Sequence, residues 1–200
     1  GYQLYGLRPY PRAAPLAHIP GLPGTESAAV PFRQYRAHGR LEESAEGFRG
    51  FTRAMPEVLS FRAEYAFDLA TLSRWGEAWR MYQPATRAGL VYSQMALRGV
   101  ASLKTGRLDE ALRELKEDIG RYPFNAGLLI LEYSDACIAV ARREMAGHRY
   151  GPAARSLEGA VESLSRPMPA NAEAEKWRRG SLSEARDLQG KLETIQKPDR

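Results

Sequence analysis

The stretch GRLDEALRELKEDIGRYP, residues 106–123, decides the organisation of the chain. It opens on a Gly-Arg-Leu turn signal, carries the apolar residues Ala111 and Leu115 four positions apart, and closes on Pro123. Residues four positions apart lie on one face of an α-helix, and proline interrupts the helical hydrogen bonds. The stretch therefore predicts one amphipathic helix. Whether that helix belongs to a repeat depends on further copies of the pattern.

Four blocks of the chain share this opening. They begin at residues 39, 73, 106 and 148 with GRLEESAEGF, SRWGEAWRMY, GRLDEALREL and HRYGPAARSL. Successive openings lie 34 (39 to 73), 33 (73 to 106) and 42 (106 to 148) residues apart. Each block has an opening apolar residue, a small residue three positions later and a large apolar residue four positions after that. The opening residues are Leu41, Trp75, Leu108 and Tyr150, the small ones Ser44, Ala78, Ala111 and Ala153, and the large ones Phe48, Tyr82, Leu115 and Leu157.

A second helix is predicted before each block. Nine residues before the opening apolar residue stand Phe32, Ala66, Gly99 and Ala141. Small residues in both helices let a helix hairpin pack closely, while the large residues fill the gaps around them. The long third interval predicts that the helix starting near residue 125 is about two turns longer than the others. In the first copy, Pro31 and Phe32 predict only a short leading helix.

This register resembles the tetratricopeptide repeat, a helix-turn-helix unit of about 34 residues. The resemblance covers residues 31–167 and implies an all-α fold, an α-solenoid of about four helix hairpins. An amphipathic stretch over about 170–196, within residues 168–200, is expected to be a capping helix that Gly180 and Ser181 kink or split. The alternative is an irregular α-helical bundle with accidental periodicity.

Residues 1–30 differ from the rest of the chain and predict an extended, proline-rich arm. Five prolines in this segment each fix φ and remove a backbone donor. An extended segment cannot build a core of its own, so we predict that the arm docks onto another surface; the alternative is a mobile tail. Its apolar anchors are Tyr2, Leu4, Tyr5, Leu7, Tyr10, Leu16, Ile19 and Leu22.

The resemblance also implies a binding groove, because the leading helices of such repeats line a concave face and family members are overwhelmingly protein-binding scaffolds. Family members that grip a C-terminal carboxylate place lysines and asparagines there, so a groove with Arg142 as its one basic residue disfavours such a clamp. We expect an apolar groove that a partner or the arm fills; the alternative is that packing among the repeats buries it. The matching positions are Ala63, Phe67, Ala70, Ala96, Val100, Leu103, Ile138, Arg142 and Met145.

The composition argues against nucleic-acid binding and against catalysis. Twenty-nine basic residues stand against 24 acidic ones, and they interleave at helical spacing, which is typical of solvated helix faces. The single cysteine and the three histidines show no metal-ligand spacing, and no phosphate loop is present, so we predict no metal, no cofactor and no enzyme. The helix-interior acids worth testing as a catalytic pair are Asp68 and Asp118, and the expected alternative is that they reach solvent or an arginine.

These observations predict a non-catalytic protein–protein interaction scaffold, an accessory subunit of a larger assembly. The alternatives are a self-assembling structural protein with arm-into-groove exchange between copies and, less favoured, a nucleic-acid-binding repeat that uses Arg142, Arg143, Arg178 and Arg179. The longest apolar run, residues 126–131, is far short of the ~20 residues that span a bilayer, which leaves open peripheral association with a membrane complex. The non-Met start and the arm favour an exported, periplasmic protein over a cytoplasmic one, although the sequence does not fix the compartment.

Overall fold

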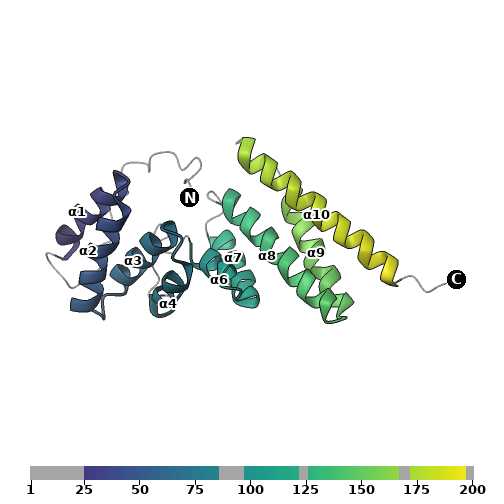
Figure 1. Ribbon diagram of the computed structural model, residues 1–200, viewed down its shortest axis with the longest axis horizontal. Coiled ribbons are helices and arrows are strands. Elements are labelled where there is room, and N and C mark those ends of the chain that lie inside the picture. The colour runs from purple at the N-terminus through teal and green to yellow at the C-terminus, as the bar shows by residue number, and fades with distance from the viewer. Residues whose placement is uncertain (1–24, 86–96, 122–125, 167–171, 197–200) are drawn as a thin grey trace. The chain divides into compact units, whose positions relative to one another are not determined.

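A computed structural model describes residues 25–85, 97–121, 126–166 and 172–196, and these residues form α-helices joined by turns, without a β-strand (Figure 1). The predicted all-α class is confirmed. The chain divides into two compact units, Gly1–Leu97 and Arg98–Arg200. The sequence did not predict this division of the helical region. The arm residues 1–24 lie outside the described residues.

The described residues of the first unit, 25–85, form two helix hairpins in sequence order. The first hairpin is α1 and α2, the second is α3 and α4, and α2 also packs on α3. Their bounds are α1 Thr25–Ala37, α2 Leu41–Ala54, α3 Leu59–Thr71 and α4 Trp75–Ala85. Helix α1 has 13 residues, so two predictions are wrong: the leading helix of the first copy is not short, and the extended arm does not continue to residue 30.

The second unit contains two further hairpins, α6 with α7 and α8 with α9, and α10 packs on both α8 and α9 (Figure 1). Helix α8 has 21 residues where α3 has 13, which confirms the predicted extra length of about two turns. The bounds are α6 Arg98–Lys104, α7 Leu108–Arg121, α8 Ala126–Ala146, α9 Tyr150–Leu164 and α10 Ala172–Gln196.

The same turn connects the two helices of every hairpin. Each second helix begins on the predicted opening apolar residue, and the residue two positions earlier has a positive φ. In each turn the following arginine donates its backbone N–H to the carbonyl five residues before it, as Arg40 does to Tyr35 at 2.8 Å. This is the Schellman closure of a helix C-terminus. The positive φ values are 76° at Gly39, 61° at Ser73, 77° at Gly106 and 57° at His148.

The small and large residues of the repeat pattern are all fully buried within the hairpins. A Cβ placed on Gly99 would lie 2.7 Å from Cγ of Leu115 and 3.0 Å from its backbone nitrogen. A residue larger than glycine at this position would therefore prevent α6 from packing this close to α7. In the first hairpin the leading helix carries Phe32 at the corresponding position. There the space comes from the partner helix instead, because a Cβ on Gly47 would lie 2.0 Å from the Phe32 ring.

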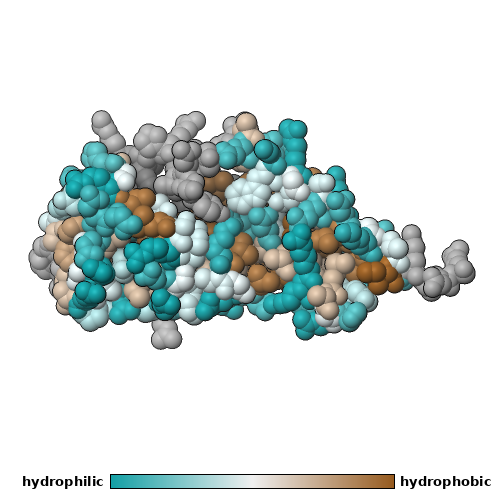
Figure 2. Space-filling model, in the orientation of Figure 1, coloured by the Kyte–Doolittle hydropathy of each residue, from teal (hydrophilic) through white to brown (hydrophobic). Residues whose placement is uncertain are grey.

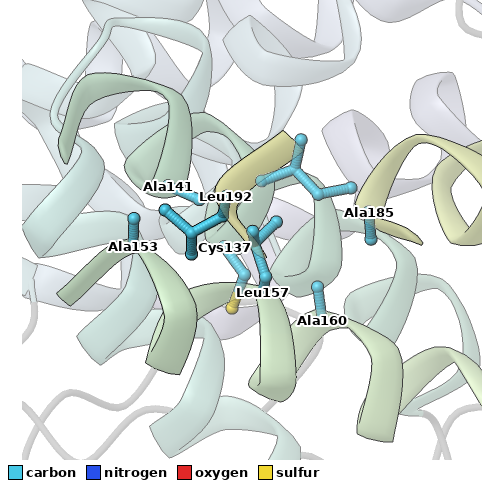
Figure 3. Packing of buried hydrophobic residues seen from close by; sticks show 8 residues of the cluster. Cys137, Ala141, Ala153, Leu157, Ala160, Ala185 and Leu192 are labelled. Atoms are coloured by element: carbon cyan, nitrogen blue, oxygen red, sulfur yellow. The ribbon is translucent and has the colours of Figure 1, made fainter. Parts of the chain in front are cut away.

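Alanines and leucines form the core of the second unit, where α8, α9 and α10 meet (Figure 3). The leucines fill the space that the alanines leave between the helix backbones. Cys137 lies in this core, and burial raises the pKa of its thiol to about 11. The core residues are Cys137, Ile138, Ala141, Ala153, Leu157, Ala160, Ala185 and Leu192.

Candidate functional site

A groove of about 690 Å³ lies between α8 and α10 in the second unit. Its lining residues recur at helical spacing, so the groove is formed by one stripe of each helix. Two predicted groove residues, Ile138 and Arg142, belong to it. Helix α8 contributes Asp135, Ile138, Ala139 and Arg142, and α10 contributes Glu173, Lys176, Trp177, Gly180, Ser181 and Glu184.

Polar contacts hold the two walls of the groove together. Nε1 of Trp177 donates to Oδ2 of Asp135 at 2.9 Å, and Oγ of Ser181 donates to Oδ1 at 2.7 Å. Further along, Nη2 of Arg142 pairs with Oε1 of Glu184 at 2.8 Å. Residue numbers rise together on both helices, so α8 and α10 run parallel. Ser181 is buried by this contact and α10 continues through it, so the helix is not split at this point: packing on α8 outweighs the low helix propensity of Gly180.

The carboxylate of Asp135 carries an uncompensated negative charge. It is half-buried, and each oxygen accepts one hydrogen bond from a neutral donor. Within the described part of the chain no cation pairs with it. A carboxylate offers about four acceptor positions, so about two stay available to an incoming donor. A half-buried charge of this kind favours a cationic ligand.

One side of the groove is open at Gly180. A Cβ on this residue would meet no atom within 4 Å, although the residue lines the groove. Trp177 is half-buried beside it. The groove therefore combines an indole ring, the apolar side chain of Ile138 and an uncompensated carboxylate with space to receive another side chain.

The other predicted groove residues have different environments. Three on α3, namely Ala63, Phe67 and Ala70, are buried, and the guanidinium of Arg36 lies 4.9 Å from the centre of the Phe67 ring. Val100 is also buried, while Leu103 and Met145 are half-buried and Arg142 is exposed. Ala96 and all eight arm anchors lie outside the described residues. Partner binding by these positions stays a prediction.

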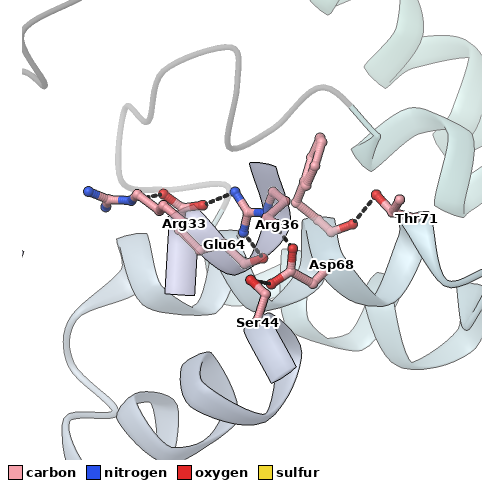
Figure 4. Close-up of polar contacts among 7 residues, drawn as sticks. Arg33, Arg36, Ser44, Glu64, Asp68 and Thr71 are labelled. Atoms are coloured by element: carbon pink, nitrogen blue, oxygen red, sulfur yellow. Dashed lines mark hydrogen bonds and ion pairs between the residues drawn. The ribbon is translucent and has the colours of Figure 1, made fainter. Parts of the chain in front are cut away.

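An ion-pair network connects the leading helices α1 and α3 (Figure 4). Arg33 and Arg36 on α1 pair with Glu64 at 3.0 and 2.6 Å, and Arg36 also pairs with Asp68. Ser44 donates to the second oxygen of Asp68 at 2.6 Å. Burial raises the pKa of Asp68, and the charge of Arg36 opposes that effect. Asp68 is thus held in a buried ion pair, as predicted for a helix-interior acid.

Asp118 is held in a comparable way in the second unit. Nη2 of Arg98 lies 3.1 Å from Oδ1 of Asp118 and 3.2 Å from Glu117, and its Nε lies 3.7 Å from Glu114. Three carboxylates thus surround one guanidinium. Burial raises the pKa of Asp118 to about 6 and also raises that of Glu114. Each of the two acids tested as a catalytic pair is therefore engaged by an arginine of its own unit.

The four arginines named for nucleic-acid binding all pair with carboxylates. Arg142 pairs with Glu184, and Arg143 with Asp109 at 2.7 Å. Arg178 and Arg179 both pair with Glu175, and their hydrogen bonds lower its pKa to about 2. On the face seen in Figure 2, hydrophobic residues form small separate areas among hydrophilic ones. The guanidinium charges of these four arginines are each compensated by a carboxylate, which disfavours them as a phosphate-binding cluster.

No group of three or more His, Cys, Asp or Glu side chains in residues 25–85, 97–121, 126–166 and 172–196 is arranged to hold a metal ion. None of the helices described there has both the length and the hydropathy needed to cross a bilayer.

The sequence predicted two of the ten residues that line the groove, Ile138 and Arg142. It predicted a capping helix over about 170–196 without assigning any of its residues to a groove, and it named Ser181 only as a point where that helix kinks or splits. A signal was present, because the lining residues of α10 recur at three and four positions. Asp135 is also an acid within the otherwise apolar run of α8. The pairing of the two stripes depends on contacts more than 40 residues apart in sequence, which periodicity does not give.

Comparison with known proteins gives a likeness of fold. No family model matches the sequence, and no curated protein matches it. A solved structure titled "MamA RS-1 ArsTM double mutant" is similar to this chain with a TM-score of 0.50 and 13% sequence identity. The match covers 84% of this chain and 97% of that one. MamA is a tetratricopeptide-repeat protein, so the likeness supports a helical-repeat fold of that kind.

Proposed function

We propose that the chain is a non-catalytic protein-interaction scaffold, a solenoid of tetratricopeptide-like helix hairpins that serves as a subunit of a larger assembly. The observation that carries the proposal is the groove between α8 and α10, where Trp177 and Ile138 lie beside the uncompensated carboxylate of Asp135. Aromatic side chains next to a directed charge are common on protein-binding surfaces. The repeated Schellman turns and the fold likeness to a tetratricopeptide-repeat protein support the same reading.

Binding accounts for the groove better than catalysis does. Burial raises the pKa values of the carboxylates of Asp68, Glu114 and Asp118, and each of these groups pairs with an arginine. In the groove, Asp135 accepts hydrogen bonds that fix α10 on α8. These contacts preorganise a surface, which lowers the entropy cost of binding a partner.

The test fills the groove without touching the core. Gly180→Trp adds a large side chain where a Cβ meets no atom within 4 Å, and Gly190→Trp is the matched control on the same helix, equally open and outside the groove. The full chain is purified from its source together with its stoichiometric partners, which mass spectrometry quantifies. We expect Gly180→Trp to lose a partner that Gly190→Trp retains. Equal recovery by both variants, or no stoichiometric partner, would contradict the proposal.

A further inference from the structure

We infer that the groove between α8 and α10 binds the stretch Arg8–Arg12, with the sequence RPYPR, from the N-terminal arm of a second copy of the chain. The inference rests on the proposed function, since it takes the groove to be a protein-binding surface. It assigns to that surface a partner segment, a binding mode and a polarity of assembly.

The charge of the groove favours a basic segment. Its lining contains three acids, Asp135, Glu173 and Glu184, and two bases, Arg142 and Lys176. Arg142 is neutralised by Glu184, whereas Asp135 has only neutral donors. With Glu173 and Lys176 as the remaining lining charges, Asp135 is the half-buried acid of the groove that has no ion-pair partner among the described residues, and it lies beside the indole of Trp177.

An arginine fits this position better than a lysine. A guanidinium is planar, stacks on an aromatic face and donates in a fixed fork to a carboxylate. Asp135 keeps acceptor positions free for such a fork, and Trp177 is held next to it by its own hydrogen bond to the same carboxylate. One guanidinium can thus contact the indole ring and the carboxylate together.

The N-terminal arm supplies the matching chemistry. Residues 1–24 include Arg8 and Arg12 and no aspartate or glutamate. Between the arginines lie Pro9, Tyr10 and Pro11, which supply apolar surface for the half-buried ring of Trp177. Prolines restrict the backbone before binding, so less conformational entropy is lost when the segment is captured.

The spacing of the charges also agrees. Along α8 the two polar ends of the groove, Asp135 and the Arg142–Glu184 pair, are seven residues apart, or about 10 Å at the helical rise. In an extended proline-type backbone, Arg8 and Arg12 are four residues apart, or about 12 Å. Arg8 at Asp135 therefore brings Arg12 close to Glu184, which pairs with Arg142 through Oε1.

A second copy is the natural source of the segment. The arm precedes α1, and the groove is formed by α8 and α10 in the other unit. A contact between copies does not depend on the distance between the arm and the groove of one chain. Each chain then offers one arm and one groove, a heterologous contact that adds copies head to tail.

The test is a complementation between two defective full-length chains. The double variant Arg8→Glu, Arg12→Glu keeps the groove and loses the basic segment, and Gly180→Trp keeps the segment and fills the groove. Light scattering after size exclusion, over a wide range of concentration, measures the mass of each. We expect the unchanged chain and Gly190→Trp to exceed the mass of two chains as concentration rises, and each defective variant alone to stay a single chain.

The mixture of the two defective variants gives the decisive result. One intact arm and one intact groove allow a single contact, so we expect a complex of two chains that grows no further. Asp135→Asn, whose amide can still accept from Trp177, should weaken that complex about tenfold, as loss of one charge-assisted bond does. Added salt should weaken it as well.

Other outcomes overturn the inference and leave the proposed function distinguishable. An unchanged chain that stays a monomer, or a mixture that forms no complex, contradicts arm exchange between copies. Association that survives Arg8→Glu, Arg12→Glu but not Gly180→Trp assigns the groove to another segment. If either result occurs while Gly180→Trp still loses a stoichiometric foreign partner, the groove is a binding surface for that partner alone.

Discussion

The ring of Phe32 occupies the space in which a side chain of residue 47 would have to lie. A Cβ on Gly47 would be 2.0 Å from Cδ1 of Phe32. The ring cannot easily move aside, because it packs edge-on against Phe48 and Phe51 with centroid distances of 5.9 and 5.4 Å. In the first hairpin the small residue is therefore on the second helix and the large one on the first, the reverse of the α6–α7 hairpin, where Gly99 faces Leu115.

Gly47→Ala should destabilise the protein by about 1–3 kcal/mol, because overpacking at Phe32 outweighs the better helix propensity of alanine. Urea unfolding followed by circular dichroism measures the change. Gly50→Ala on the same helix is the control; it meets no atom within 4 Å and should stabilise by about 0.5–1 kcal/mol. In a Phe32→Ala background the cost of Gly47→Ala should vanish, and an undiminished cost there would refute the steric explanation.

Asp68→Ala should destabilise by about 3–5 kcal/mol, because it leaves the part-buried guanidinium of Arg36 short of a partner and removes the acceptor of Ser44. Glu77→Ala removes an exposed partner of Arg74 and should cost less than about 1 kcal/mol. Thermal unfolding of both variants compares the two costs. Similar losses of stability for the two substitutions would show that burial of the α1–α3 network does not determine how much it contributes to the free energy of unfolding.

The stability of the second unit should depend on pH through Asp118. Its pKa is about 6 in the folded protein and about 3.9 when unfolded, so between these values the folded state binds more protons. The free energy of unfolding contributed by this group therefore rises as pH falls through about 6 and is lost again as pH rises. Relative to Asp118→Asn, the unchanged protein should gain up to about 2 kcal/mol from pH 8 to pH 4.5. Urea titrations at both values measure the gain, and a pH-independent difference would contradict the raised pKa.

Ser73 and Gly106 occupy the same position of their hairpins, with φ of 61° and 77°. Left-handed backbone costs a serine about 1 kcal/mol that glycine avoids. Ser73→Gly should therefore stabilise the protein by about 0.5–1 kcal/mol, and Gly106→Ser should destabilise it by a similar amount. Differential scanning calorimetry would show the two shifts in opposite directions. Shifts of the same sign would mean that side-chain contacts, and not φ, decide these positions.

Local periodicity explains what the sequence predicted well. The turns, the opening residues and the extra length of α8 depend on a few neighbouring positions, such as Gly106 before Leu108, and these recur along the chain. Small and large side chains at those positions have the same packing task in every copy, so their burial followed from the pattern.

Pairing between distant helices explains what the sequence missed. In the first hairpin the large side chain, Phe32, is on the first helix and the small residue, Gly47, is on the second. Sequence periodicity does not reveal this reversal, because either helix of a hairpin can provide the space. The bonds of Trp177 and Ser181 to Asp135 join residues 42 and 46 positions apart. They set which face of α10 meets α8, and with it the groove, and they also outweigh the helix-breaking signal of Gly180.

The reactivity of Cys137 can report how often the core of the second unit opens. This residue is the one cysteine of the chain, and its thiol, buried in the core to which α8, α9 and α10 contribute, reacts as a thiolate only when that core opens. The rate at which this thiol is alkylated therefore measures how often the core opens, and no engineered label is needed. A partner that binds the groove and holds α10 against α8 should lower the rate of Cys137 alkylation. Thiol trapping can therefore report occupancy of the groove inside a cell.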